Sequence, residues 1–153
     1  MILDRRMTRK RHIVDRSKQL KSKLKEFYWL IGRRCNLNVQ SKIMLYKAIL
    51  KPVWTCGIQL WGTATMSHIN KIETMQAKIL RTIVNAPWYV RNEDIRRDLG
   101  IPTVKEEISR YAEKYKVRIA IHPNRLAAET INTLNMERRL KRKHPADLTK
   151  DIT

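Results

Sequence analysis

Carboxylates, cysteine and glycine are all scarce in this 153-residue chain, which has 14 Asp and Glu, two cysteines and four glycines. Cys35 and Cys56 cannot complete a structural zinc site by themselves, and the four histidines do not have metal-ligand spacing. Two reduced thiols in an intracellular protein are the simplest interpretation. The chain has no glycine-rich phosphate loop and no recognisable pairing of nucleophile and base. We therefore expect no catalytic residue, cofactor or metal ion in this chain.

The densest group of carboxylates is Glu93, Asp94 and Asp98, which suggests a metal site at first sight. Capping of a helix N-terminus and local pairing with Arg97 explain the same three residues without a metal. We therefore prefer the structural interpretation.

The sequence also lacks segments that would direct it into a membrane. Its first residues are too basic, and too poor in apolar residues, for a secretory signal. The apolar stretch 43–61 has the length of a bilayer span, but Lys47, Lys51 and Pro52 would lie near its centre, where charge is costly. We expect a soluble intracellular protein, in the nucleus or the cytoplasm.

Positive charge is the most unusual property of the sequence. Lys and Arg number 33, which gives a formal net charge of +19 and a pI near 10.5. Residues 1–34 alone hold 12 basic and 3 acidic residues. A field of this sign attracts polyanions, either nucleic acid or an anionic membrane surface.

The least charged part of the chain lies between residues 43 and 70, where the only formal charges are Lys47 and Lys51. Its apolar residues recur at helical spacing on two faces, which is typical of a buried helix. Pro52 lacks a backbone donor and clashes with the preceding turn, so we expect two helical pieces, 39–50 and 53–61, at an angle. Helical geometry is disfavoured for the residue before a proline, so Lys51 should not have helical backbone angles.

Apolar periodicity predicts further helices on both sides of this stretch, at about 8–32, 67–84, 92–99 and 103–121, with a short one at 124–131. Thr103 and Glu106 have the spacing of a capping box. The residues expected to be buried are Ile13, Leu20, Leu24, Phe27 and Ile31 in the first helix; Ile69, Ile72, Gln76, Ile79, Leu80 and Ile83 in the next; and Val104, Ile108, Tyr111, Tyr115 and Ile119 in the last long one.

These elements predict an all-α fold. Residues 8–134 should form a small bundle of about five or six helices, with the 43–61 segment at its centre. Residues 135–153 should form a flexible basic tail, because the apolar period fails there.

Two groups of cations are candidate phosphate contacts. One projects from a single face of the first helix, where Asp15 and Glu26 are the only acidic residues, and the other forms a run near the C-terminus. The simpler interpretations are a solvated helix face and a nuclear-import signal. Phosphate contacts would be independent of sequence and would weaken steeply with salt. The candidate residues are Arg11, Lys18, Lys21 and Lys25, and in the tail Arg138, Arg139, Lys141, Arg142 and Lys143.

Aromatic residues next to basic ones are candidates for stacking on bases. Trp29 adjoins the basic helix and Trp88 adjoins Arg91, whereas Trp54 and Trp61 lie in the apolar stretch and are expected in the core. A helix-turn-helix around Gly100 is disfavoured, because two glutamates near the start of its second helix would repel DNA.

Two segments of the chain resemble a known family. The sequences "LYKAILKPVWTCGIQLWG" and "ILRTIVNAPWYVRNEDIRRDLGIPT" are similar to the C-terminal part of the reverse transcriptase of non-LTR retrotransposons, in particular jockey-like insect elements. The family usually has an aromatic residue where Cys56 stands and a tryptophan near Arg9. These differences concern local packing.

The resemblance implies a thumb, a helical bundle that holds the primer and template duplex against the palm. Residues 1–7 would then be the end of the palm. The metal-binding aspartates of such polymerases lie in a palm motif, aromatic-x-Asp-Asp, and this chain contains no adjacent Asp-Asp pair. We expect the chain to be inactive alone, with Mg²⁺ needed only by a palm. Endonuclease, fingers and palm are missing, which implies a truncated element copy, a partial gene model or a co-opted remnant.

The main hypothesis is therefore a thumb and C-terminal segment of an RNA-directed DNA polymerase. Its partners would be an RNA template, an RNA:DNA hybrid or DNA, together with the rest of the polymerase. The alternatives are a co-opted or structural helical module that binds RNA or a protein, and a degenerate remnant without a role.

Overall fold

The computed structural model describes residues 9–124, 126 and 148. Within these residues the secondary structure is helical and contains no strand, which confirms the all-α fold class. The expected terminal segments 1–7 and 135–153, with the exception of the buried Leu148, and most of the short helix expected at 124–131 lie outside the described residues. The elements are α1 (Lys10–Glu26), α2 (Tyr28–Ile31), α3 (Val39–Leu45), the π-helical turn η1 (Tyr46–Leu50), α4 (Lys51–Thr55), α5 (Ile58–Trp61), α6 (Met66–Val84), α7 (Asn92–Leu99) and α8 (Val104–Ala120).

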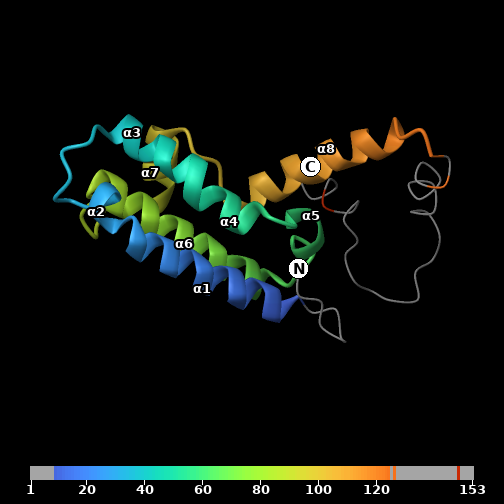
Figure 1. Ribbon diagram of the computed structural model, residues 1–153, viewed down its shortest axis with the longest axis horizontal. Coiled ribbons are helices and arrows are strands. Elements are labelled where there is room, and N and C mark those ends of the chain that lie inside the picture. The colour runs from blue at the N-terminus through green and yellow to red at the C-terminus, as the bar shows by residue number, and fades with distance from the viewer. Residues whose placement is uncertain (1–8, 125, 127–147, 149–153) are drawn as a thin grey trace.

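Three helical rods form the body of the molecule (Figure 1). Helices α1 and α6 pack against each other and run in the same direction, whereas α3, η1 and α4 form one rod that runs the opposite way across both. Helix α7 packs on α6, and α8 contacts α5 and α6 and then extends away from the body. As a consequence, the C-terminal ends of α1 and α6 lie at the same end of the molecule, far from the tip of α8.

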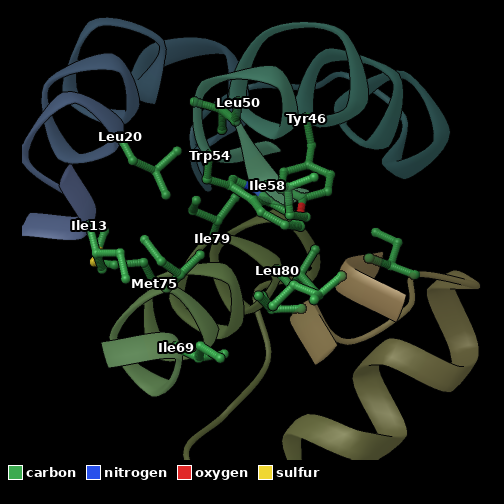
Figure 2. Packing of buried hydrophobic residues seen from close by; sticks show 14 of the residues in the cluster. Ile13, Leu20, Tyr46, Leu50, Trp54, Ile58, Ile69, Met75, Ile79 and Leu80 are labelled. Atoms are coloured by element: carbon green, nitrogen blue, oxygen red, sulfur yellow. The ribbon is translucent and has the colours of Figure 1, made fainter. Parts of the chain in front are cut away.

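The core lies between these rods (Figure 2). The rod of α3, η1 and α4 contributes Tyr46, Leu50 and Trp54, all fully buried, which confirms the central stretch as the interior of the fold. Complete burial of one such large side chain contributes about 1.5–3 kcal/mol relative to exposure. Every predicted core residue of α6 is buried. In α1 and α2 the buried apolar residues are Ile13, Leu20 and Ile31, with Leu24 and Phe27 packed against the core.

The predicted break at Pro52 is wrong. The helical rod continues without interruption from Val39 to Thr55, and Lys51 keeps helical angles (φ −60°, ψ −46°). The turn before the proline is π-helical, and the Lys51 N–H donates to Tyr46 O, five residues back. Proline in a regular helix clashes with the carbonyl four residues earlier, and a wider turn relieves that clash. The rod ends at Thr55, because Cys56 is extended (φ −60°, ψ 119°) and Gly57 has a φ of +69°.

Helix α8 also departs from the prediction. Its buried residues are Val104, Glu107, Ile108 and Ala112, all in its first half. Tyr115, which was expected in the core, is 41% exposed, and Ile119 is only half-buried. The apolar periodicity correctly predicted a helix here, but the second half of α8 extends beyond the bundle (Figure 1).

Polar contacts fix the position of α8. Its capping box is present as predicted: Glu106 N–H donates to Thr103 Oγ1 at 3.2 Å, and Thr103 N–H donates to the Glu106 carboxylate at 2.9 Å. The Glu107 carboxylate is fully buried and forms ion pairs with Lys51 of α4 and with Arg110, the latter at 2.7 Å. One buried carboxylate therefore links α8 to the central rod.

Candidate nucleic-acid interface

The four predicted phosphate contacts of α1 face the solvent. Arg11, Lys18, Lys21 and Lys25 are all exposed. Within residues 9–124, no carboxylate lies within ion-pair distance of any of them. The positive charge of this face is therefore not neutralised by the described part of the chain.

Helix α6 extends this face with two lysines that the sequence analysis left out of the site. Lys71 and Lys78 are exposed and are seven residues apart, which is about 10.5 Å along the helix. They share a ridge with His68 and Met75, and Met75 points towards Ile13 of α1 (Figure 2). The ridge thus flanks α1.

The pKa of His68 reflects this placement. Burial lowers the pKa of His68, and the positive charges of Lys71 and of Lys10 lower it further. Since Lys10 opens α1 and Lys71 lies near the start of α6, cations of the two helices converge here. We call the exposed cations of this surface the basic strip: Lys10, Arg11, Lys18, Lys21 and Lys25 of α1, and Lys71 and Lys78 of α6.

The acidic residues of α1 lie beside the strip. Asp15 and Glu26 project on the order of 90° from the mean direction of Arg11, Lys18, Lys21 and Lys25, on the flank away from α6. Both have partners there, since Asp15 accepts from Gln19 at 2.9 Å and Glu26 pairs with Lys23 at 2.8 Å. The strip itself therefore presents one sign of charge across two parallel helices.

Other cations of the bundle have structural roles. Lys42 is buried and donates to Gly32 O at 3.0 Å, and Arg96 pairs with Glu73. Arg81 of α6 donates to Pro87 O, Val90 O and Asn92 Oδ1. These side chains hold loops and helices, and we exclude them from the interface.

The tryptophans divide as predicted between core and surface. Trp54 and Trp61 are buried, and the Trp61 indole N–H donates to Trp54 O at 3.1 Å. Trp29 in α2 is 70% exposed and Trp88, in the loop after α6, is 89% exposed. Both outer tryptophans are accessible to a ligand. The predicted contacts Arg138, Arg139, Lys141, Arg142 and Lys143 lie outside the described residues.

The described part of the chain contains neither a membrane-spanning helix nor a group of metal-binding side chains. None of its helices combines the length and apolar composition needed to cross a bilayer. No group of three His, Cys, Asp or Glu side chains in residues 9–124 is arranged to hold a metal ion.

Comparison with known proteins gives a consistent set of relatives. The chain is 42% identical over 154 residues to an RNA-directed DNA polymerase from the mobile element jockey of Drosophila melanogaster, with 95% of this chain and 17% of the relative covered. It is 40% identical over 148 residues to a probable RNA-directed DNA polymerase from the transposon X-element of the same species, covering 97% of this chain and 16% of the relative. The jockey polymerase of Drosophila funebris is 38% identical over 156 residues, covering 97% and 17%.

These relatives are much longer than this chain, which spans about one sixth of their length. No family model matches the chain, and no solved structure matches it.

Proposed function

Because the chain is homologous, along nearly its whole length, to a segment of the RNA-directed DNA polymerases of the jockey and X-element mobile elements, we propose that it acts as a nucleic-acid-binding part of such a polymerase. In this role it holds the primer and template duplex as a thumb does. Polymerisation itself requires the palm, which carries the aspartates that bind the metal ions.

The basic strip is the observation that carries the proposal. Its seven cations are exposed and lie along two parallel helices, and within residues 9–124 none of them is in an ion pair. An isolated solvated helix face would have cations on one helix only. Two rows of like charge side by side repel each other, and a polyanion laid across them relieves that repulsion.

The expected binding mode follows from the chemistry of the strip. Six of the seven side chains are lysines, which contact phosphate as point charges and do not read bases. Each phosphate contact releases counterions, so the logarithm of the binding constant falls with the logarithm of the salt concentration by about 0.9 per contact with duplex. Binding should therefore be independent of sequence and strongly dependent on salt.

A salt titration with an RNA:DNA hybrid, duplex DNA and single-stranded RNA tests the proposal. The hybrid should bind best, and replacing Lys18, Lys21 and Lys25 by Gln should weaken binding and flatten the salt slope. The matched control is Lys105→Gln, Lys114→Gln and Lys116→Gln, three exposed lysines of α8 that lie outside the strip. Absence of binding at low salt, or equal losses in the two triple variants, would refute the proposal.

A further inference from the structure

Three aromatic side chains in residues 9–124 are at least 70% exposed although the bundle has a well-formed core. Trp29 is 70% exposed, Trp88 is 89% exposed and Tyr89 is 70% exposed. The rings of Trp88 and Tyr89 meet edge to face, with centroids 6.0 Å apart. Large aromatic rings normally contribute most when they are buried, so exposed rings at fixed positions suggest a ligand.

Arg81 of α6 holds the loop that carries Trp88 in place. The guanidinium donates to Pro87 O at 2.9 Å, to Val90 O on the other side of the two aromatic residues, and to Asn92 Oδ1 at 2.8 Å. The three acceptors offset the cost of desolvating this partly buried cation, so the loop keeps one conformation around it. Arg81 thus fixes the backbone that presents Trp88 and Tyr89.

The turn that carries Trp29 is held in a similar way. Lys42, 6% exposed, donates to Gly32 O at 3.0 Å, and the Gly32 N–H donates to Tyr28 O at 2.7 Å. A Cβ at residue 32 would lie 2.6 Å from Tyr28 O, so only glycine fits this turn. Buried Ile31 anchors the segment to the core. Each exposed tryptophan is therefore on a segment fixed by a cationic side chain from another element.

Both segments lie at the end of the molecule where α1 and α6 finish, and thus at one end of the basic strip (Figure 1). Exposed arginines accompany them: Arg33 and Arg34 come after α2, and Arg91 is two residues after Tyr89. The nearest acidic residues in the sequence are Glu26, which pairs with Lys23 at 2.8 Å, and Glu93 and Asp94 in the first turn of α7, where Asp94 pairs with Arg97 at 3.7 Å. The combination of exposed rings and arginines is that of surfaces that bind single-stranded nucleic acid.

We propose that α2 and the loop 85–91 form a stacking site for unpaired nucleotides, which continue from a duplex held on the basic strip. Base pairs inside a duplex are already stacked on both sides, and only the end pair has one free face, whereas every base of a single-stranded overhang can stack on a tryptophan. The inference rests on the proposed function, because the strip must hold the duplex for its end to reach the aromatic rings. It adds a preference for junctions between duplex and single strand.

The test compares a blunt RNA:DNA hybrid with the same hybrid extended by a short single-stranded overhang, using fluorescence anisotropy with the whole chain. The overhang should tighten binding by about 5-fold to 100-fold for each stacked base. Trp29→Ala and Trp88→Ala should reduce this gain and leave binding of the blunt hybrid unchanged. Trp88→Phe, which keeps a ring, should retain part of the gain. The matched control, Ile121→Ala, removes an apolar side chain that is similarly exposed at the far end of α8.

The outcomes separate this inference from the proposed function. If the blunt hybrid binds and the overhang adds nothing, the stacking site is refuted while the basic strip stands. If neither ligand binds, the proposed function fails. If sedimentation shows that the chain self-associates and that Trp88→Ala abolishes the association, the rings form a contact between copies and the inference is overturned.

Discussion

Three lysines of α1 and two lysines of the central rod have opposite environments, although the two regions pack against each other. Lys18, Lys21 and Lys25 project into water with no carboxylate near them in the described residues. Lys42 and Lys51 lie among apolar side chains, and each has an acceptor, Gly32 O and the Glu107 carboxylate. A cation inside the bundle must be paired, since desolvation without a partner is costly. A cation that stays unpaired at the surface is free for a ligand.

The largest effect should come from breaking a buried pair. Glu107→Ala leaves Lys51 partly buried without its carboxylate, and we expect the free energy of unfolding to fall by about 3–5 kcal/mol. Urea denaturation followed by circular dichroism measures this change. Glu113→Ala, an exposed position on the same helix, should change stability by less than about 0.5 kcal/mol. A similar small effect at both positions would remove the distinction between interior and surface charges.

The next effect should appear in binding and not in stability. Charge reversal at Lys18, Lys21 and Lys25 to Glu should weaken binding of RNA:DNA hybrid by on the order of 100-fold or more at low salt, because repulsion replaces three phosphate contacts. The salt slope should fall by about 1 for each lost contact. Anisotropy titrations at several salt concentrations measure both quantities. An unchanged affinity would make this face of α1 a solvated surface only.

A smaller effect tests whether α6 belongs to the same surface. Lys71→Gln with Lys78→Gln removes two contacts, and we expect affinity for the hybrid to fall by about 10-fold with a slope lower by about 2. Lys47→Gln, an exposed lysine on the central rod, is the control and should have little effect. If Lys47→Gln weakens binding as much as the double change does, attraction by the net charge explains the affinity without a defined strip.

The smallest effect concerns pH. His12 is 2% exposed, and its pKa is lowered below 6.5 by burial and by the nearby charge of Arg16. Below about pH 6.5 the unfolded chain binds a proton that the folded chain does not, so stability should be complete above that pH and should fall as the pH is lowered. The slope cannot exceed about 1.4 kcal/mol per pH unit for this group.

His68, whose pKa is also lowered, adds to the same trend, so the variant must isolate His12. Urea denaturation from about pH 7.5 to about pH 5, a range that brackets the reference pKa of about 6.5, should show a free energy of unfolding that depends less on pH in His12→Gln than in the parent chain. His122→Gln, at an exposed position, is the control. If the free energy of unfolding changes equally with pH in the parent chain and in His12→Gln, His12 does not contribute to the pH dependence of stability.

Much of the fold could be predicted because its signals are local. The capping box of Thr103 and Glu106 and the apolar stripe of α6 depend on residues within a few turns, and both are present as predicted. The exposure of Trp29 and Trp88 and the burial of Trp54 also followed from their neighbours in the sequence. Such features need no knowledge of how the helices pack.

What the sequence could not provide depends on packing between distant segments. Lys71 and Lys78 join the site only because α6 runs beside α1 in the same direction. Arg81 has the same spacing signal as an ordinary surface arginine, and its acceptors become visible only when the loop after α6 folds back. Tyr115 has the spacing of a core position, but it is exposed because α8 extends beyond the helices that it packs against. Periodicity alone does not show where that happens.

The π-helical turn from Tyr46 to Leu50 gives the central rod about one residue more than a regular helix of the same length, because its hydrogen bond joins residues five apart and not four. Deleting one residue within this turn would restore a regular turn, and the side chains that follow would keep their directions, so Trp54 would stay in the core. Pro52 would then clash with the carbonyl four residues before it. Deleting one residue from α4, which has no such extra residue, would instead rotate the residues that follow by about 100° and should be the more damaging change.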